Sequence, residues 1–438
     1  SGLQMNVQMR AMNVDAWRSL SSHIAGNEQK GSADSASDGA GIAQYIDPDR
    51  MSAQANELTV LDKKLENVVV GAYRQKNSWQ ANIDSNQVSG HISWDHSGSG
   101  LGKVTARLTQ LVVPESVAAD VSEILEGKNE ATSIPALDVV ADHFELFNKK
   151  LGRLELQAEN ARSAQGREWQ IRQLTLQNPD AELKASGRWI TSGIASGITS
   201  GIASATVGGT PGTSADAGNL TQLSYALNIL DAGKLLERLG SPNLLRAGKG
   251  KMEGDITWKG LPFALDIPTL SGKLSLSVGA GQFLKVEPGA AKLLGVLSLQ
   301  ALPRLLKLDF HDVFSEGFAF DSITAQANIK QGVLYTDSLK MRGVSATVLM
   351  EGSADIAKET QNLRVVVIPD FNVGTASVVY ALAVNPVIGL GTFLAQLFLK
   401  NPVMKVLTFQ YQVTGTWKDP NVSKFDGKLP QAGQDGNK

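Results

Sequence analysis

The side chains that most often carry catalysis are sparse in this chain, and their spacing does not bring them together. The 438 residues include five histidines and no cysteine, which excludes thiol nucleophiles, disulfides and thiolate metal sites. His91 and His96 lie in an extended run at a spacing that puts them on opposite sides of a strand, so a shared metal ion is not expected. His311 has aspartates close by, but adjacent strand residues point apart, which favours a turn or surface position.

One glycine-rich run, residues 98–104, has a partial likeness to a phosphate-binding loop. Ser97 stands where the first glycine belongs, and Val104 stands where a serine or threonine would hold magnesium. No helical pattern follows it, so we interpret the run as a hairpin turn. The carboxylates are scattered over polar strand positions and turns. We therefore expect no enzyme, no catalytic residue, no metal site and no cofactor.

The composition is that of a globular protein with a large core. Apolar residues make up 42% of the chain and charged residues 19%, which argues against an intrinsically disordered chain. The 41 basic and 43 acidic residues give a net charge of −2. No overall basic field is present to hold nucleic acid, so we exclude that class of partner.

The dominant hydrophobic period is two residues, which is typical of strands with one apolar and one polar face. In Leu407–Val413 every odd position is apolar and every even one is polar, and Trp417 continues the odd positions. We count about eighteen such short runs, most of them separated by turn residues. A glycine-to-tryptophan pattern recurs at Gly90–Trp94 and Gly254–Trp258 and indicates a drifting repeat of hairpins. A sandwich, a barrel or a folded-over antiparallel sheet would each hide the apolar faces.

Three segments are linker-like, and a few are helical. Small and polar residues dominate 26–41, 191–219 and the tail 428–438, which we expect to be flexible. Helices are predicted over the following ranges: 115–126, Asp231–Leu239, and an apolar stretch 288–308 that begins at Pro288 and is kinked at Pro303. We place a domain boundary between an N-terminal β-rich segment, 1–134, and a second segment, 135–427.

The segment Phe371–Leu399 carries no charge, and three structures are compatible with it. It is long enough to cross a bilayer, but Asn385-Pro386 divides it into two short halves. The alternatives are a buried helical hairpin that caps the sheet, a membrane contact at its tip, and a full transmembrane span. Lys400 and Lys405 follow it and can reach a headgroup layer.

Several strings in the C-terminal half match a known family in order. They are Gly281-Gln282-Phe283-Leu284-Lys285-Val286-Glu287-Pro288-Gly289, Leu297–Arg304, Gly317–Asp321, Asn385-Pro386-Val387 and Gly415–Pro420. With these strings the chain resembles the AsmA-like periplasmic proteins, specifically the YhdP type, and more distantly the TamB-like proteins. The resemblance covers roughly residues 135–422. The 190–219 insert and His311, where the family commonly has a basic residue, depart from the pattern.

The resemblance implies a fold and a function. The expected fold is mainly β, a long twisted antiparallel sheet folded into a hydrophobic groove, with a few short helices near the C-terminal end. The expected function is transport of phospholipid through the periplasm from the inner to the outer membrane, with the acyl chains in the groove. Family members are longer and begin with an inner-membrane helix, so this chain resembles their C-terminal portion. The resemblance identifies no protein partners.

The alternating strands supply candidate groove residues, chosen as the apolar positions of each run. They are Ile256, Trp258, Leu274, Leu276, Val278, Ala346, Val348, Met350, Leu407, Phe409, Tyr411 and Val413. A second set is expected to lie near a membrane at the delivery end of the groove: Leu390, Phe393, Arg304, Lys307, Lys400 and Lys405. The main alternative is a structural or assembly scaffold of the cell envelope with a sealed β core. An enzyme acting on envelope sugars or lipids is a weaker one, because no catalytic constellation is present.

Overall fold

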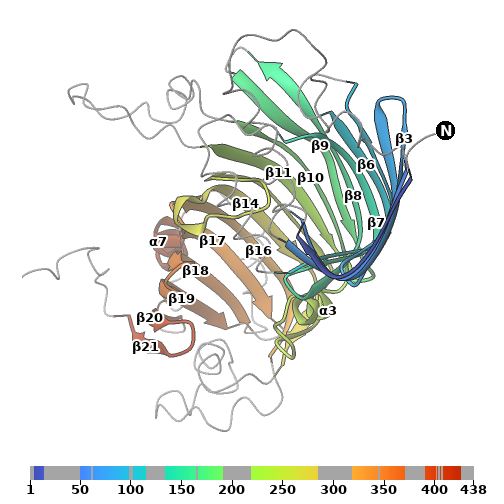
Figure 1. Ribbon diagram of the computed structural model, residues 1–438. Helices are drawn as coiled ribbons and strands as arrows, with labels where there is room; N and C mark the ends of the chain where they lie inside the picture. Colours follow the sequence, from blue (N-terminus) through green and yellow to red (C-terminus); the bar gives the residue numbers. More distant parts are fainter. Residues whose placement is uncertain are drawn as a thin grey trace, which may run out of the picture. The chain divides into compact units, whose positions relative to one another are not determined.

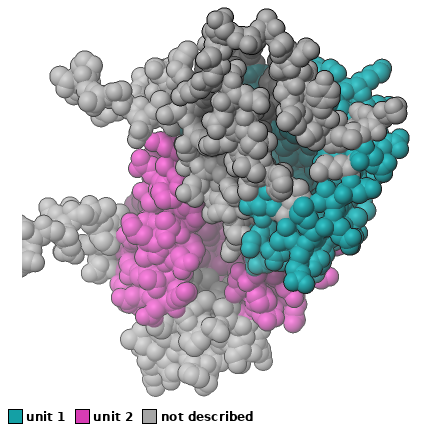
Figure 2. All heavy atoms as spheres, in the orientation of Figure 1, with its two compact units in different colours: residues 1–178, 183–221, 260–264 teal, residues 179–182, 222–259, 265–438 magenta. Residues whose placement is uncertain are grey.

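The structure is a computed structural model in which strands dominate (Figure 1). It describes residues 4–13, 50–60, 63–97, 102–114, 134–163, 166–190, 219–284, 318–343, 346–369, 390–400, 402, 405 and 408–425. The 21 described strands are assigned to a mixed sheet. The chain divides into two compact units, with residues 1–178, 183–221 and 260–264 in unit 1 and the remainder in unit 2 (Figure 2).

Unit 1 is built almost entirely of sequentially paired strands. These are β1 (Gln4–Asn13), β2 (Arg50–Val60), β3 (Lys63–Gln75), β4 (Ser78–Asp84), β5 (Val88–Asp95), β6 (Lys103–Val113), β7 (Ala136–Leu146), β8 (Lys149–Ser163), β9 (Gly166–Gln177) and most of β10 (Ala181–Ile190). Two pairs, β1–β2 and β6–β7, are parallel, which differs from the purely antiparallel pairing expected. Each of them is joined by a long connection, and a parallel pair needs one because the chain must return to the same edge of the sheet.

Unit 2 is also built mainly of strands, and it contains two described helices. Its elements are β11 (Leu220–Ile229), α3 (Ala232–Arg238), β12 (Leu245–Ala247), β13 (Gly250–Lys259), the 3-10 turn η5 (Ile267–Thr269), β14 (Ser271–Val278), β15 (Gly281–Phe283), β16 (Phe318–Lys330), β17 (Val333–Gly343), β18 (Ala346–Asp355), β19 (Thr360–Pro369), α7 (Leu390–Lys400), β20 (Phe409–Thr416) and β21 (Pro420–Lys424). Seven successive pairs are antiparallel: β13–β14, β14–β16, β16–β17, β17–β18, β18–β19, β19–β20 and β20–β21. Figure 1 shows β16 to β19 side by side.

Local sequence explains the turns and the short helix. The two-residue turn between β7 and β8 places Phe147 and Asn148 at positive φ, and Gln331-Gly332 does the same between β16 and β17. Such turns match the twist of a hairpin. α3 is capped by Asp231, whose side chain accepts a hydrogen bond from the backbone N–H of Lys234 at 3.1 Å. The helix predicted over Asp231–Leu239 is therefore confirmed.

Helix α7 covers an apolar patch on β18 and β19. Leu390, Leu394 and Leu397 are buried against three residues of the sheet: Leu349, Val366 and Ile368. β18 has five consecutive buried residues at its start, so both of its faces are covered there. At residues 390–399 the uncharged segment therefore forms a helix that covers the sheet, as in the capping alternative. Residues 370–389 lie outside the described residues.

The mainly β fold class is confirmed. The predicted helices 115–126 and 288–308, and most of the linkers 26–41 and 191–219, lie outside the residues that the structure describes, as does the tail 428–438. The predicted boundary at 134/135 lies between the paired strands β6 and β7, while the compact units divide near 178–222. The domain division stays a prediction.

The packing of α7 gives a direct test. Leu394 is 3% exposed and Leu399, one and a half turns later, is 82% exposed. We expect Leu394→Ala to lower the free energy of unfolding of unit 2 by about 3 kcal/mol, because it leaves a cavity against the sheet. Leu399→Ala is the matched control and should leave stability unchanged in denaturant titrations. Equal effects of the two variants would show that α7 does not pack as described.

Candidate functional site

An unbroken row of apolar residues crosses unit 1 at right angles to its strands. Each residue lies directly opposite the next on the neighbouring strand, so all share one face of the sheet. From β2 to β9 the row is Met51, Ala72, Ala81, Ile92, Ala106, Val139, Leu156 and Leu174. The register therefore joins eight short strand patterns into one continuous apolar stripe.

A second row runs beside the first and is equally continuous. It consists of Ala53, Val70, Ile83, Gly90, Leu108, Ala141, Leu154 and Leu176. At Gly90 the backbone has φ +141°, and a Cβ there would lie 2.4 Å from the carbonyl oxygen of Arg107. A larger residue would push β5 away from β6, so the glycine keeps the row closed at this bulge.

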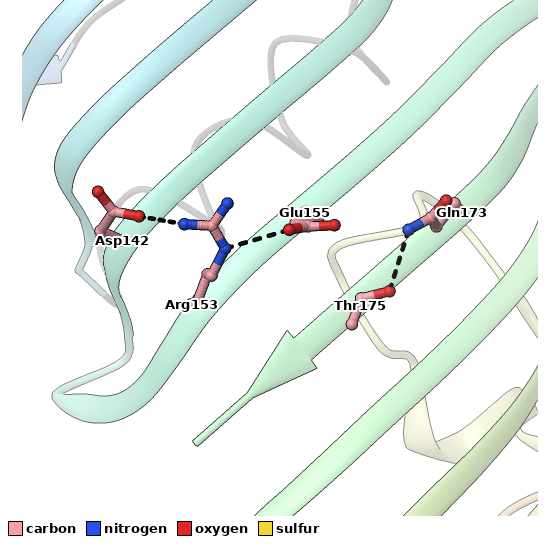
Figure 3. A network of polar contacts seen from close by, with 5 residues as sticks. All are labelled: Asp142, Arg153, Glu155, Gln173 and Thr175. Carbon is pink, nitrogen blue, oxygen red and sulfur yellow. Dashed lines mark hydrogen bonds and ion pairs between the residues drawn. The ribbon is translucent and has the colours of Figure 1, made fainter. Parts of the chain in front are cut away.

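The opposite face of the same strands is polar. On β8 the side chains that alternate with Leu154 and Leu156 are charged, and Arg153 forms ion pairs with Asp142 and Glu155, the latter at 3.1 Å (Figure 3). On β9 the Gln173 amide donates to the Thr175 hydroxyl at 3.4 Å. Unit 1 is therefore a sheet with one apolar and one wet face, and its apolar face is the candidate site.

Unit 2 carries the same kind of row. From β14 to β20 it consists of Val278, Ile323, Met341, Val348, Val367 and Phe409, each paired directly with the next. A neighbouring row passes through Leu339, Met350, Val365 and Tyr411. Both rows belong to one apolar cluster, to which Ile229 at the end of β11 and Ala232 at the start of α3 also contribute.

The structure brings together eleven of the twelve candidate groove residues in two clusters. Val278, Ala346, Val348, Met350 and Val413 are buried in one of them, with Leu276, Phe409 and Tyr411 packed against them. Trp258 is buried in the other, with Ile256 and Leu274 packed beside it. Leu407 lies outside the described residues. Their shared face agrees with the strand parity, and their part in lipid binding stays a prediction.

The two apolar faces differ in how far they are open to solvent. Val348 is 0% exposed and Val367 is 2% exposed, and Leu235 of α3 packs against the same cluster. In unit 1 the row residues Ile92, Leu156 and Leu174 are only half-buried. Burial raises the pKa of the Tyr411 hydroxyl above its ordinary value, so this group stays neutral at physiological pH. The face of unit 1 is the more accessible of the two.

The predicted membrane-proximal residues separate into two environments. Leu390 is buried and Phe393 is half-buried, both against β18 and β19, whereas Lys400 and Lys405 are exposed. Arg304 and Lys307 lie outside the described residues. Among the helices that the structure describes, none is both long and apolar enough to span a bilayer. Contact of these residues with a membrane stays a prediction.

The described residues of the histidine and glycine-rich motifs include His91 on β5 and Lys103 and Val104 on β6. The His91 ring is held between the Asn82 and Gln80 side-chain oxygens, at 2.9 Å from each. β6 begins at Lys103 and pairs with β5 across the glycine-rich run, so a strand and not a helix follows that run. Among the described residues no group of three or more potential metal ligands is found. His311 is not among them.

Sequence reasoning missed most of the site, because it named no residue of unit 1. The alternation in Val88–Trp94 and Leu154–Ala158 was a signal for it, since Ile92, Leu154 and Leu156 all prove to be row residues. The contribution of α3 had no signal, because a seven-residue helix shows too little periodicity to indicate which face it buries.

Comparison with known proteins identifies the family. The sequence profile of the YhdP protein family matches residues 1–422. The chain belongs to the YhdP family. It is also 35% identical, over 189 residues, to the intermembrane phospholipid transporter YhdP of Escherichia coli (strain K12); the match covers 43% of this chain and 15% of that relative. No solved structure matches it.

The closed cluster of unit 2 generates the second prediction. Val348→Asp places a charge at a fully buried position, so we expect the free energy of unfolding of unit 2 to fall by about 4 kcal/mol. Thr324→Asp is the control, because Thr324 is exposed and pairs with Lys340 on the other face. Thermal melting of both variants measures the difference. A Val348→Asp protein as stable as the parent would show that this face is open to water.

Proposed function

We propose that this chain shields phospholipid acyl chains on its apolar sheet face, as one section of an intermembrane phospholipid carrier. The observation that carries the proposal is the unbroken apolar row across β2–β9 of unit 1, most of whose residues are only half-buried. Proteins in water rarely leave a contiguous apolar surface of this extent without a ligand or partner. Membership of the YhdP family and the name of the E. coli relative support it.

The geometry of the apolar face favours movement of an acyl chain along it over binding of that chain in one closed pocket. Neighbouring strands are about 4.8 Å apart, so the surface beneath an acyl chain is nearly the same after each step along the rows, from one strand to the next. Each methylene removed from water contributes about 0.8 kcal/mol, so even a partly covered chain is held. A surface of repeated aliphatic side chains offers many equivalent positions and no deep minimum.

The finer parts of the proposal extend beyond this chain. We propose that the carrier works in the periplasm, between the inner and outer membranes, and that the whole protein is anchored in the inner membrane by an N-terminal helix. The matched stretch spans 15% of the E. coli relative, so the activity of a whole protein of that length is part of this proposal. Movement from the inner towards the outer membrane is the direction that the family resemblance implies.

A second candidate function has one observation in its favour. The cluster around Val348, Val365 and Val367 is closed to solvent, as in a sealed core. A purely structural or assembly scaffold of the envelope would have such a core throughout. The apolar face of unit 1 distinguishes the two functions, because a scaffold with a sealed core would bury this face fully.

Two directly paired positions on each face of unit 1 provide the test. Leu156 pairs with Leu174 on the apolar face, and Gln157 pairs with Gln173 on the polar face. With a photo-crosslinking amino acid at each position in turn, we expect phospholipid adducts at the two leucine sites and none at the two glutamine sites. Mass spectrometry of the adducts and of organic extracts identifies the lipid.

Two outcomes would contradict the proposal. Equal labelling of the leucine and glutamine positions would show that lipid does not select the apolar face. Absence of lipid both from the extracts and from all four crosslinking sites would favour the scaffold. Circular dichroism of each substituted protein verifies that the fold is retained.

A further inference from the structure

The tryptophans of unit 1 gather at one edge of its sheet. Trp79 is the second residue of β4 and Trp94 is the second-to-last residue of β5, and the two are directly paired across the strands. Trp169 lies near the start of β9 and Trp189 near the end of β10. These positions share an edge because each strand from β4 to β9 pairs with the next, and a three-residue turn leads from β9 into its partner β10.

Trp79 and Trp94 also lie on the apolar face. They open a third transverse row, which consists of Trp79, Trp94, Val104, Leu137, Ala158 and Ile171. This row runs two residues outside the row that contains Ile92, so it borders the apolar face at that edge. Trp94 is 39% exposed, and its ring lies against that of His96 in a tilted contact with centroids 4.2 Å apart.

Unit 2 repeats the arrangement independently. A transverse row runs through Ile256, Gly272, Ile329, Leu334, Ala354, Gln361 and Gly415. Trp258 follows Ile256, the row residue of β13, by two positions. Trp417 follows Gly415, the row residue of β20, by two positions, and both tryptophans therefore lie at the same edge. The six tryptophans within the described residues therefore all lie at one sheet edge of their own unit.

The opposite edge of unit 2 carries phenylalanine instead. Phe283, Phe320 and Phe409 belong to the apolar cluster there, and the rings of Phe283 and Phe320 pack with centroids 5.2 Å apart. Phenylalanine has no polar atom, whereas tryptophan carries an N–H donor on an otherwise apolar ring. The indole rings at one edge can therefore donate hydrogen bonds, whereas the phenyl rings at the other cannot.

Indole rings favour the boundary between hydrocarbon and water, where the ring is shielded and the N–H meets an acceptor. In unit 1 the Trp169 Nε1 donates to the Pro135 carbonyl oxygen at 3.0 Å, but the buried Trp189 Nε1 meets no hydrogen-bond partner among the residues that the structure describes. A buried donor of this kind indicates a missing acceptor. Phosphate and ester oxygens of a phospholipid are acceptors of the required type.

The dimensions agree with a lipid lying along the strands. A ten-residue strand spans about 33 Å, and the acyl chains of one leaflet extend over about 15 Å, half of a bilayer core. A lipid whose headgroup rests at one edge thus has its acyl chains entirely on the apolar face, with their ends pointing towards the other edge.

We propose that the tryptophan edge of each unit binds the phosphate and ester region of a diacyl phospholipid, while the acyl chains lie along the strands towards the opposite edge. This inference rests on the proposed function, since it orients a lipid already held on the apolar face. Lipids then occupy the face in one orientation and keep their headgroups along a single edge.

Fluorine NMR of the full chain labelled with fluorotryptophan tests this orientation. Single Trp→Phe variants assign the resonances, and Phe409→Trp adds a matched reporter at the phenylalanine edge of unit 2. The protein is loaded from mixed micelles with phosphatidylcholine that carries a nitroxide either on the headgroup or near the end of an acyl chain. Reduction of the nitroxide with ascorbate gives the reference spectrum.

We expect the headgroup nitroxide to cause loss of the Trp79, Trp94 and Trp417 signals, and the chain-end nitroxide to cause loss of the signal that the Phe409→Trp variant adds. Reversed or equal losses at the two edges would overturn the inference while leaving acyl-chain binding intact. No loss with either lipid would overturn the proposed function as well. The two failures are therefore distinguishable in one set of spectra.

Discussion

The structure depends on one constraint, the alternation of side chains between the two faces of a strand, held in phase from each strand to the next. A slip of one residue in any pair would turn that strand's apolar side chains to the wet face and interrupt every transverse row. Extra residues are instead absorbed by bulges, at Ser89/Gly90 and Gln157/Ala158 in unit 1 and at Thr336/Leu339 in unit 2. The rows resume in phase beyond each bulge.

Keeping the phase gives the two faces different roles in stability. On the wet face of unit 1 the ion pairs of Arg153 and Arg172 lie between largely exposed groups, which contribute little to stability. The apolar rows therefore carry most of the cohesion between strands. In unit 2 the outer face of β18 and β19 is itself apolar, and α7 covers it; beside that patch, Arg364 pairs with Glu351 and lies over the Phe425 ring. A sheet that is apolar on both faces needs such a cover on its second face, whereas a sheet with one polar face can expose that face to water.

Alternation in the sequence was sufficient to predict the strands and the face of residues such as Leu276, Val348 and Val413, because the period of two is a property of each strand alone. Pairing was not predictable in the same way. The parallel pairs β1–β2 and β6–β7 depend on where a long connection returns, which leaves no local pattern. The place of Leu390 was ambiguous for a different reason: an uncharged helix suits a membrane and a protein core equally. In the structure, the first five residues of β18 are all buried, so both faces of this strand are covered and α7 covers one of them.

An aliphatic face cannot distinguish one phospholipid from another, because lipids of different headgroup present the same methylenes to it. Any selectivity must arise where polar atoms meet the protein, and on these sheets that is an edge. The two edges of unit 2 are chemically unlike, with indole rings at one and phenyl rings at the other. The carrier that we propose would separate its two tasks: the face would supply an attraction that is nearly uniform along the rows, so that lipid could advance, while the edge would bind one end of the lipid.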